Sequence, residues 1–191
     1  MIRIRETAPP LDYSFKNLEK IDELHLQRPR RGVKRYRRTS SGRYSCTSLR
    51  LNNNQLTTIH GIHAVAYQIL EQPEKLTWLD LSFNKLTSVA PEIASFPSLK
   101  ILYLHGNQLS DLTASVRPLK CLDDLYSLTL HGNPVEERKG YRAKVLTSLP
   151  QLRSLDFTNV TAAELKQIQI RKSASAAAEN YQYQNRVKST F

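Results

Sequence analysis

Leucines recur along the middle of the chain in a fixed pattern of apolar and polar positions. Each copy fits the template Leu-x-x-Leu-x-Leu-x-x-Asn-x-Leu, in which apolar residues alternate across a short segment and an asparagine follows. Four copies align, with spacings of 30, 23 and 26 residues between the asparagines Asn54, Asn84, Asn107 and Asn133. A fifth, degenerate copy lacks the asparagine and consists of Leu152, Leu155, Phe157 and Val160.

This spacing predicts short strands, because alternate side chains of a strand point to opposite faces. The leucines then fill one core, and the asparagines turn inward to bond backbone groups that no strand satisfies. Cys46 occupies the first leucine position of copy one, so we interpret it as a small buried hydrophobe. The predicted fold is an α/β leucine-rich repeat solenoid of about five repeats, with parallel strands on the concave face and helices and turns on the convex face.

The connections between the strands carry helical patterns. Apolar residues at Ile62, Val65, Ala66, Ile69 and Leu70 predict a helix that ends before Pro73, which explains the long first spacing. Residues 134–160 form the predicted C-terminal cap, with a helix that carries Tyr141, Val145, Leu146 and Leu149 and stops at Pro150. The sequence Thr-Ala-Ala-Glu at 161–164 is a capping box, so residues 161–191 are predicted to be helical and then flexible.

Positive charge is concentrated outside the repeats. The 191 residues carry a net charge of +11, whereas residues 44–160, the predicted repeat domain, hold 11 basic and 10 acidic residues. Residues 1–43 are predicted to be an extended N-terminal arm. Residues 28–43, here called the basic segment, contain eight cations and no acid, and we expect them to contact an acidic surface: Arg28, Arg30, Arg31, Lys34, Arg35, Arg37, Arg38 and Arg43.

Several function classes find no support in the sequence. The chain has no apolar run near the ~20 residues that cross a bilayer, and its first residues lack the apolar core of a signal peptide, so a cytoplasmic protein without a membrane partner is expected. No motif of a nucleotide-binding loop, a serine hydrolase or a zinc protease is present. His105 and His131 fall at equivalent positions of adjacent repeats but lack a third metal ligand. The prediction is therefore a protein that is not an enzyme, with no metal or cofactor.

The cap carries a resemblance to a known class. The run HGNPVEERKGYRAKVLTSLPQLRSLDF at 131–157 resembles the C-terminal cap of intracellular leucine-rich repeat proteins such as dynein light chain one, the spliceosomal A-prime protein and tubulin-folding cofactors. Over residues 9–160 the chain resembles more closely the family of leucine-rich repeat-containing protein 51, through PPLDYSF, LNNN, LDLSFNKLTS, LYLHGN and SLTLHGNP. The resemblance implies a cytoplasmic, non-enzymatic protein associated with cilia and flagella, and it does not disclose the partner.

The polar template positions between the leucines predict a protein-binding concave face. Five strands make a strip ~20 Å wide, which fits one helix or a short peptide. Trp78, Ile101 and Tyr103 form an apolar and aromatic patch of the kind that anchors interfaces. The predicted protein-binding residues are Arg50, Trp78, Asp80, Ile101, Tyr103, His105, Thr129, His131 and Asp156.

These features predict an adaptor that grips a protein with its concave face and touches an acidic surface with the basic segment. Given the resemblance, axonemal proteins or the tubulin of an axonemal microtubule are the expected partners. Two alternatives remain open: an RNA-processing adaptor, in which Tyr36 and Tyr44 stack on bases, and a phosphatase or kinase regulatory subunit that uses only the concave face. Arg37-Arg38-Thr39-Ser40 also matches the pattern of a basophilic kinase site at Ser40.

Overall fold

The computed structural model describes residues 8–32, 35–170 and 173, and it is built around one sheet of seven strands in chain order. The first six strands are parallel, and the last one pairs antiparallel with its neighbour. The strands are β1 (Leu11–Asp12), β2 (Ser48–Arg50), β3 (Trp78–Asp80), β4 (Ile101–Tyr103), β5 (Ser127–Thr129), β6 (Ser154–Leu155) and β7 (Thr158–Asn159).

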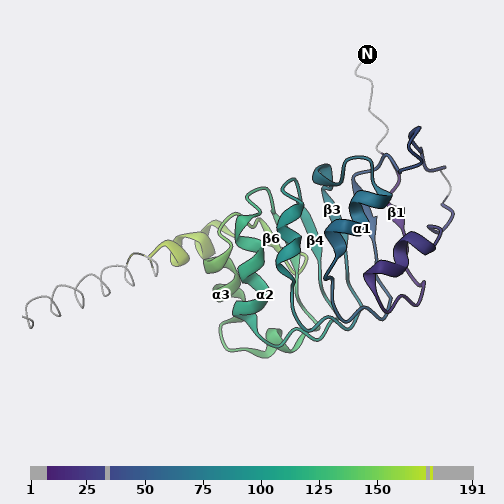
Figure 1. Ribbon diagram of the computed structural model, residues 1–191. Coiled ribbons are helices and arrows are strands. Elements are labelled where there is room, and N and C mark those ends of the chain that lie inside the picture. The colour runs from purple at the N-terminus through teal and green to yellow at the C-terminus, as the bar shows by residue number, and fades with distance from the viewer. Residues whose placement is uncertain (1–7, 33–34, 171–172, 174–191) are drawn as a thin grey trace, which may run out of the picture.

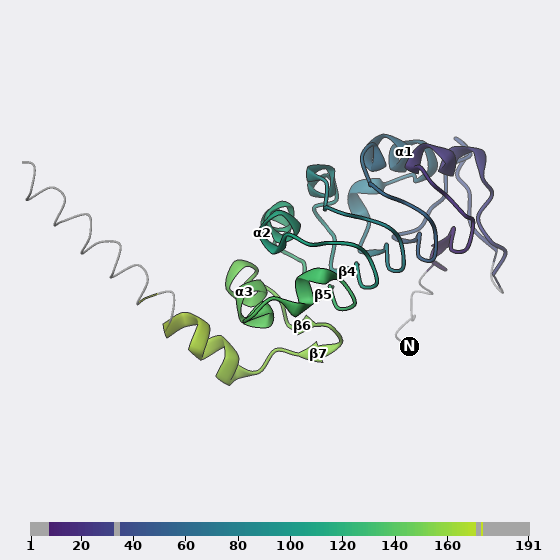
Figure 2. The same cartoon turned by 90° about the horizontal axis from the view of Figure 1, so that it is seen from below.

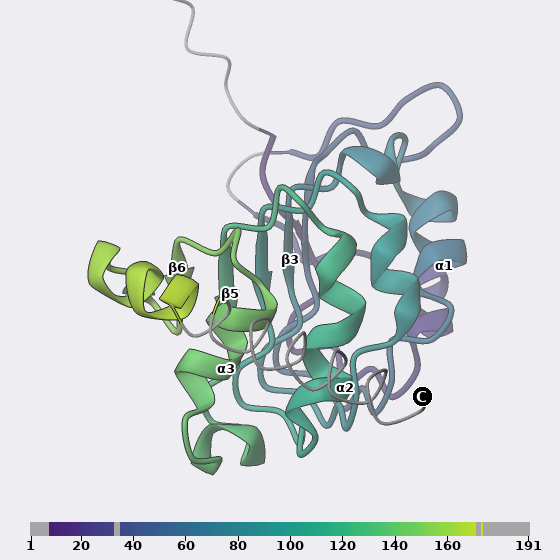
Figure 3. The same ribbon diagram turned by 90° about the vertical axis from the view of Figure 1, so that its left-hand side faces the viewer.

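Helices and single 3-10 turns carry the chain from one strand to the next. Figure 1 shows the coils stacked side by side, and Figure 2 shows that they follow an arc with the α-helices along one edge and the strands along the other. The end-on view of Figure 3 places helices and strands on opposite sides of each coil. The helical elements are η1 (Ile21–Leu26), α1 (Ile62–Ile69), η2 (Pro73–Lys75), η3 (Pro91–Ser95), α2 (Leu112–Val116), η4 (Arg117–Cys121), η5 (Pro134–Glu137) and α3 (Tyr141–Ser148).

The repeat leucines form the core, as the pattern predicted. Leu49, Leu79, Leu102, Leu128 and Leu155 are in register across β2 to β6, and all are buried. Stacking one coil on the next buries a continuous apolar interior that no single repeat closes alone. The α/β leucine-rich repeat solenoid is confirmed, together with the helices expected after residue 62 and after residue 140.

The asparagines form the predicted ladder inside the turns. The Asn84 side-chain oxygen accepts a hydrogen bond from Leu56 N at 3.1 Å, and its amide nitrogen donates to the carbonyls of Leu51 and Leu81, each at 3.0 Å. Asn107 and Asn133 repeat this arrangement, and all are buried. These residues satisfy backbone groups in the core and are not available as a binding site.

The N-terminal region differs from the extended arm predicted for residues 1–43. Leu11–Asp12 is the first strand of the sheet, and Leu11, Tyr13 and Leu18 are buried in the same core as the repeats. The sequence LDYSFKNL at 11–18 matches LDLSFNKL at 79–86 at each apolar position, but its asparagine stands one residue later. That shift hid an additional N-terminal copy from a template aligned on asparagine.

The C-terminal end of the sheet closes with a hairpin and a further helix. Asp156 and Phe157 form the turn between β6 and β7 with positive φ angles of 53° and 60°. The predicted capping box is present, since Thr161 N donates to the Glu164 carboxylate at 2.9 Å and Glu164 N donates to Thr161 Oγ1 at 3.2 Å. It opens a helix over residues 162–170, which projects from the end of the arc in Figure 2. The described part of the chain has no helix that is long and apolar enough to span a membrane.

Candidate protein-binding face

The predicted apolar patch lies on the concave face at the centre of the sheet. Trp78 on β3 is paired in register with Ile101 on β4, and both side chains are half-buried. The ring of Tyr103, two residues after Ile101, meets the Trp78 indole edge to face with centroids 6.0 Å apart. The leucines between these positions point into the core, so their neighbours are presented together on the open side.

The patch continues into a larger group of rings that surrounds His105. Four rings have centroids within 6 Å of the His105 imidazole: His131 at 4.7 Å, Phe83 at 5.0 Å, Phe157 at 5.6 Å and Tyr103 at 5.9 Å. The two imidazoles are stacked with planes 7° apart, and the other pairs are edge to face. We call these five residues the aromatic cluster. Aromatic groups gathered on an exposed face are typical of protein interfaces.

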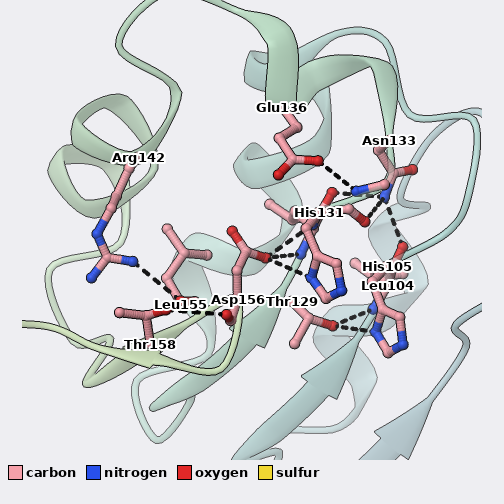
Figure 4. A network of polar contacts seen from close by, with 12 residues as sticks. Leu104, His105, Thr129, His131, Asn133, Glu136, Arg142, Leu155, Asp156 and Thr158 are labelled. Atoms are coloured by element: carbon pink, nitrogen blue, oxygen red, sulfur yellow. Dashed lines mark hydrogen bonds and ion pairs between the residues drawn. The ribbon is translucent and has the colours of Figure 1, made fainter.

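The surroundings of His105 favour its uncharged form. Its desolvation by burial, followed by the proximity of His131, lowers the pKa of His105 from its ordinary value. Thr129 Oγ1 accepts a hydrogen bond from Leu104 N at 3.2 Å and lies 2.8 Å from His105 Nδ1 (Figure 4). The hydroxyl proton is therefore free to point at Nδ1, which leaves the second ring nitrogen as a donor toward the surface.

Asp156 serves the fold and is not an open binding residue. Along the sheet, backbone amides such as Leu104 N donate to a carbonyl of the next strand. Beside the short strand β6, the Asp156 Oδ1 atom replaces that carbonyl and accepts from Leu130 N at 2.6 Å and from His131 N at 2.9 Å (Figure 4). Its second oxygen accepts from the Tyr141 hydroxyl at 2.8 Å. The carboxylate thus caps the end of the ladder.

Glu136 performs the same task for the following residue. The amide of Gly106 donates to the carbonyl of His131 in the next repeat. Gly132 is the equivalent position in the last regular repeat, and its amide donates instead to the Glu136 carboxylate at 2.7 Å (Figure 4). Two acidic side chains therefore replace backbone acceptors where the repeats end.

The prediction of an open surface is wrong for two further residues. Thr129 is 0% exposed and Asp80 is 6% exposed. Asp80 accepts hydrogen bonds from the amide and hydroxyl of Ser82 at 3.1 and 2.6 Å, which fixes the turn after β3. Arg50 is half-buried and lies between two carboxylates, 3.5 Å from Asp12 and 4.0 Å from Asp80. These polar groups stabilise the sheet, and the rings beside them form the accessible surface.

Phe83 and Phe157 belong to the aromatic cluster but were not predicted as site residues. Phe83 lies at a variable template position and is 54% exposed. Phe157 was assigned to a core position of the degenerate copy, and that assignment is wrong, because the β6–β7 turn leaves it 61% exposed. Apolar periodicity predicts neither location, because Phe83 stands at a variable template position and Phe157 stands at a core position that the β6–β7 turn exposes.

The basic segment is partly fixed to the N-terminal end of the solenoid. Arg30 donates to the carbonyl of Ser14 at 3.3 Å, and the Arg43 guanidinium lies 3.3 Å from the Glu71 carboxylate. Arg38 stacks on the Tyr44 ring with its guanidinium carbon 4.4 Å from the centroid. Lys34 lies outside the described residues. The other arginines are exposed and pair with no carboxylate among residues 8–32 and 35–170: Arg28, Arg31, Arg35 and Arg37.

The tyrosines of the basic segment do not offer faces for base stacking. Tyr44 is buried, and its backbone forms bridges to Arg38 and Leu70. Tyr36 is half-buried and meets Tyr44 edge to face at 5.7 Å, while its hydroxyl donates to the Arg30 carbonyl at 2.8 Å. Both rings anchor the segment to the solenoid, which does not favour the base stacking that the RNA alternative would need.

No metal centre is formed by the residues that the structure describes, since none of their His, Cys, Asp and Glu side chains gather in a group of three or more suited to an ion. Cys46 is buried, as predicted, and desolvation raises the pKa of its thiol above the ordinary value.

Comparison with known proteins agrees with this architecture. The family described as "Leucine-rich repeat" matches residues 68–182. Leucine-rich repeat-containing protein 51 of Macaca mulatta is 49% identical over 156 residues, which are 82% of this chain and 81% of that protein, and the human protein is 48% identical over the same lengths. The fold resembles a solved structure, the Drosophila melanogaster SNF/U2A' complex, with a TM-score of 0.58 and 19% identity over 77% of this chain and 94% of that one. The chain belongs to the leucine-rich repeat family and, within it, to the family of leucine-rich repeat-containing protein 51.

Proposed function

We propose that the protein is an adaptor of the ciliary or flagellar axoneme, which holds a protein partner on its concave face and contacts microtubules with its basic segment. The leucine-rich repeat fold is a protein-interaction fold, and the aromatic cluster is the observation that supports a partner on this side of the sheet. The axonemal assignment is supported by the resemblance described above and by the exposed arginines.

The basic segment has the properties of an electrostatic contact. Arg28, Arg31, Arg35 and Arg37 are exposed within ten residues, whereas the hydrogen bonds and ion pairs of Arg30 and Arg43 hold the backbone in place. A fixed row of cations attracts a polyanion over a Debye length of about 8 Å at physiological salt, so the contact is expected to weaken steeply with salt. Tubulin is strongly acidic and fits this requirement.

Nucleic acid is the weaker candidate for the same segment. RNA would also be attracted by the arginines, and the similarity to U2A' keeps this alternative in the test. Recognition of single strands relies on stacked aromatic side chains, however, and Tyr36 and Tyr44 are engaged inside the protein. A phosphatase or kinase regulator that uses only the concave face would not need the exposed arginines at all.

Co-sedimentation with microtubules tests the electrostatic half of the proposal. Wild-type protein should pellet with taxol-stabilised microtubules and less with microtubules whose acidic tails have been removed by protease. Reversing Arg28, Arg31, Arg35 and Arg37 to Glu should abolish pelleting. The matched control makes the same change in net charge on exposed convex residues and should pellet like wild type: Arg117→Glu, Lys120→Glu, Lys139→Glu and Lys144→Glu.

Two results would contradict the proposal. Tight binding of a mixed-sequence RNA without microtubule pelleting would favour the RNA-processing alternative, and equal loss in both charge-reversed proteins would show that total charge matters and not the basic segment. Imaging a tagged copy in ciliated cells tests the location, where axonemal signal is expected and a nuclear signal would overturn the assignment.

A further inference from the structure

The residue before each ladder asparagine has a left-handed backbone conformation, and so have the equivalent residues of the first and last copies. The side chains at these positions differ greatly. Residues 15, 53, 83, 106, 132 and 157 all have φ between 53° and 67°. In this left-handed region Gly is unstrained and Asn is tolerated, whereas a bulky side chain is strained. The chain follows that preference at Asn53, Gly106 and Gly132, and it departs from it at Phe15, Phe83 and Phe157.

Burial does not explain why phenylalanine stands at these positions. The side chains of Phe15, Phe83 and Phe157 are 64%, 54% and 61% exposed, so more than half of each ring faces outward. Asparagine or glycine would make the same turn with less strain, as the other repeats show. A strained and exposed aromatic residue is a feature that points from structure toward function.

The neighbouring glycines give Phe83 its place in the aromatic cluster. A Cβ atom on residue 106 would lie 2.7 Å from Cδ1 of Phe83, so only glycine lets the ring lie flat across this turn and reach His105. Gly132 is also tightly packed, with its Cβ position 3.3 Å from the Gly106 amide. Between Phe83 and Phe157, two successive turns therefore carry no side chain, and the stacked imidazoles form the floor between two exposed rings.

The charge around this floor is negative. The concave template positions of β3 to β6, residues 78–82, 101–105, 127–131 and 154–158, include Asp80 and Asp156 and no lysine or arginine, while the exposed Lys85 stands in the turn after β3. Asp156 is held by two backbone amides and a phenol, which bond the carboxylate without cancelling its charge. Arg50, the cation at the concave template position of β2, is shared between Asp12 and Asp80. A basic group is favoured over an acidic one beside these rings.

We infer that the aromatic cluster docks a segment of another protein that combines apolar residues with arginine or lysine. The apolar residues would lie on the floor formed by the stacked rings of His105 and His131, and a cation would stack on the exposed faces of Phe83 and Phe157. This inference rests on the proposed adaptor function and names the partner chemistry of its concave face. It assigns Phe83 and Phe157 as binding residues for which the fold itself has no need.

A subtractive peptide selection tests the inference and does not require the partner to be identified first. A phage library of random 16-residue peptides is first depleted on the full chain carrying Phe83→Asn and Phe157→Asn, and the remainder is selected on wild-type protein. The depletion removes peptides that bind the basic segment, since both proteins share it. The expected survivors are enriched in arginine or lysine next to aliphatic or aromatic residues.

Affinities of one synthesised survivor then locate its site. The double variant should bind this peptide at least about tenfold more weakly than wild type, as for a central interface residue. Phe15→Asn is the matched control, because Phe15 has the same turn and the same backbone conformation. Phe15 lies at the other end of the sheet, with its ring centroid 5.4 Å from the guanidinium carbon of Arg30. It should bind like wild type.

Nuclear magnetic resonance of wild-type protein with the same peptide covers the case in which the double variant does not fold. The largest shifts are expected at the amides of Gly106 and Gly132, which lie between the two phenylalanines. Acidic survivors, equal binding to both proteins, shifts elsewhere, or no enrichment would each overturn the inference. Microtubule pelleting is read out separately, so failure here leaves the electrostatic half of the proposed function standing.

Discussion

Two segments of this protein share nearly the same sequence and turn, yet they differ in what surrounds them. LDYSFKNL at 11–18 and LDLSFNKL at 79–86 each form a strand. In each, an aspartate accepts a hydrogen bond from the amide of the serine two residues later, at 2.8 Å in the first and 3.1 Å in the second. Each turn then places a phenylalanine in the left-handed conformation. The local sequence dictates this much in both places.

The differences arise from neighbours along the solenoid. Both segments bond the asparagine of the next copy, since Leu18 N donates to Asn54 and Leu86 N donates to Asn107. The second segment also contributes a ladder residue, Asn84, whose oxygen accepts from Leu56 N of the copy before it, whereas the first contributes none. Phe83 lies across Gly106 toward four other rings, and Phe15 lies beside Arg30. Equal local structure thus has different uses, because the adjacent repeat decides what each side chain contacts.

The largest expected effect tests whether the two segments belong equally to the core. Leu11→Ala and Leu79→Ala each remove a fully buried side chain, and each should lower the free energy of unfolding by about 2–5 kcal/mol. Chemical denaturation of the two variants measures this directly. If Leu11→Ala lowered the free energy of unfolding by less than about 1 kcal/mol while Leu79→Ala showed the full loss, residues 11–18 would be an extended arm, as the sequence suggested, and not part of the core.

The ladder gives the next largest effect. Asn54→Ala leaves the buried amide of Leu18 and the carbonyl of Tyr13 without their partner, which should cost about 1–3 kcal/mol or more. Asn17 is the asparagine within the first segment, and it is exposed. Asn17→Gly keeps its left-handed turn and should change stability by less than about 0.5 kcal/mol. The reverse order would mean that the first segment carries its own ladder residue.

The opposite end of the solenoid relies on an ion pair and should respond to acid. The Glu164 carboxylate accepts a hydrogen bond from Arg142 at 2.6 Å. This bond is the main cause that lowers the pKa of Glu164 to about 2 from the ordinary 4.5. Because the folded value is the lower one, the stabilisation is complete above pH 4.5 and is lost as the pH falls toward 2. Carboxyl carbon resonances should show this titration, and Arg142→Ala should raise the pKa of Glu164 toward its ordinary value, while the hydrogen bonds from Thr161 remain. A wild-type midpoint near 4.5 would show that the ion pair between Arg142 and Glu164 does not stabilise the fold.

The smallest expected effect concerns Phe15. Phe15→Asn removes the packing of the partly buried ring, which lowers stability, and relieves left-handed strain, which raises it. The two contributions partly offset, so the free energy of unfolding should change by less than about 1 kcal/mol. A thermal melt by circular dichroism is sufficient to detect a larger change. A loss comparable to that of Leu11→Ala would show that this ring supports the fold.

The regular part of the architecture could be predicted from the sequence because its cause is periodic. The leucines at 79, 102 and 128 repeat with their asparagines, and strand, core and ladder follow from that spacing. The first copy escaped detection because Lys16 and Asn17 stand in the opposite order to Asn84 and Lys85. The apolar positions Leu11, Tyr13 and Leu18 contained the signal that could have found it.

The binding face could be predicted only in part. Trp78, Ile101 and Tyr103 alternate with core leucines, so strand geometry alone places them on the open side. Phe83 reaches the cluster through the absence of a side chain at residue 106, and Phe157 is exposed by a turn that ends the repeats. Both depend on contacts between coils, which no pattern within one coil contains.

A paired measurement on Phe83→Asn and Phe15→Asn decides whether Phe83 serves a partner and not the fold. Chemical denaturation and affinity for the selected basic peptide are measured on both variants and on wild type. Both variants should unfold within about 1 kcal/mol of wild type, and Phe83→Asn alone should lose binding by about tenfold. A destabilisation of Phe83→Asn by more than about 2 kcal/mol, or its undiminished binding, would contradict the assignment of Phe83 as a binding residue that the fold does not need.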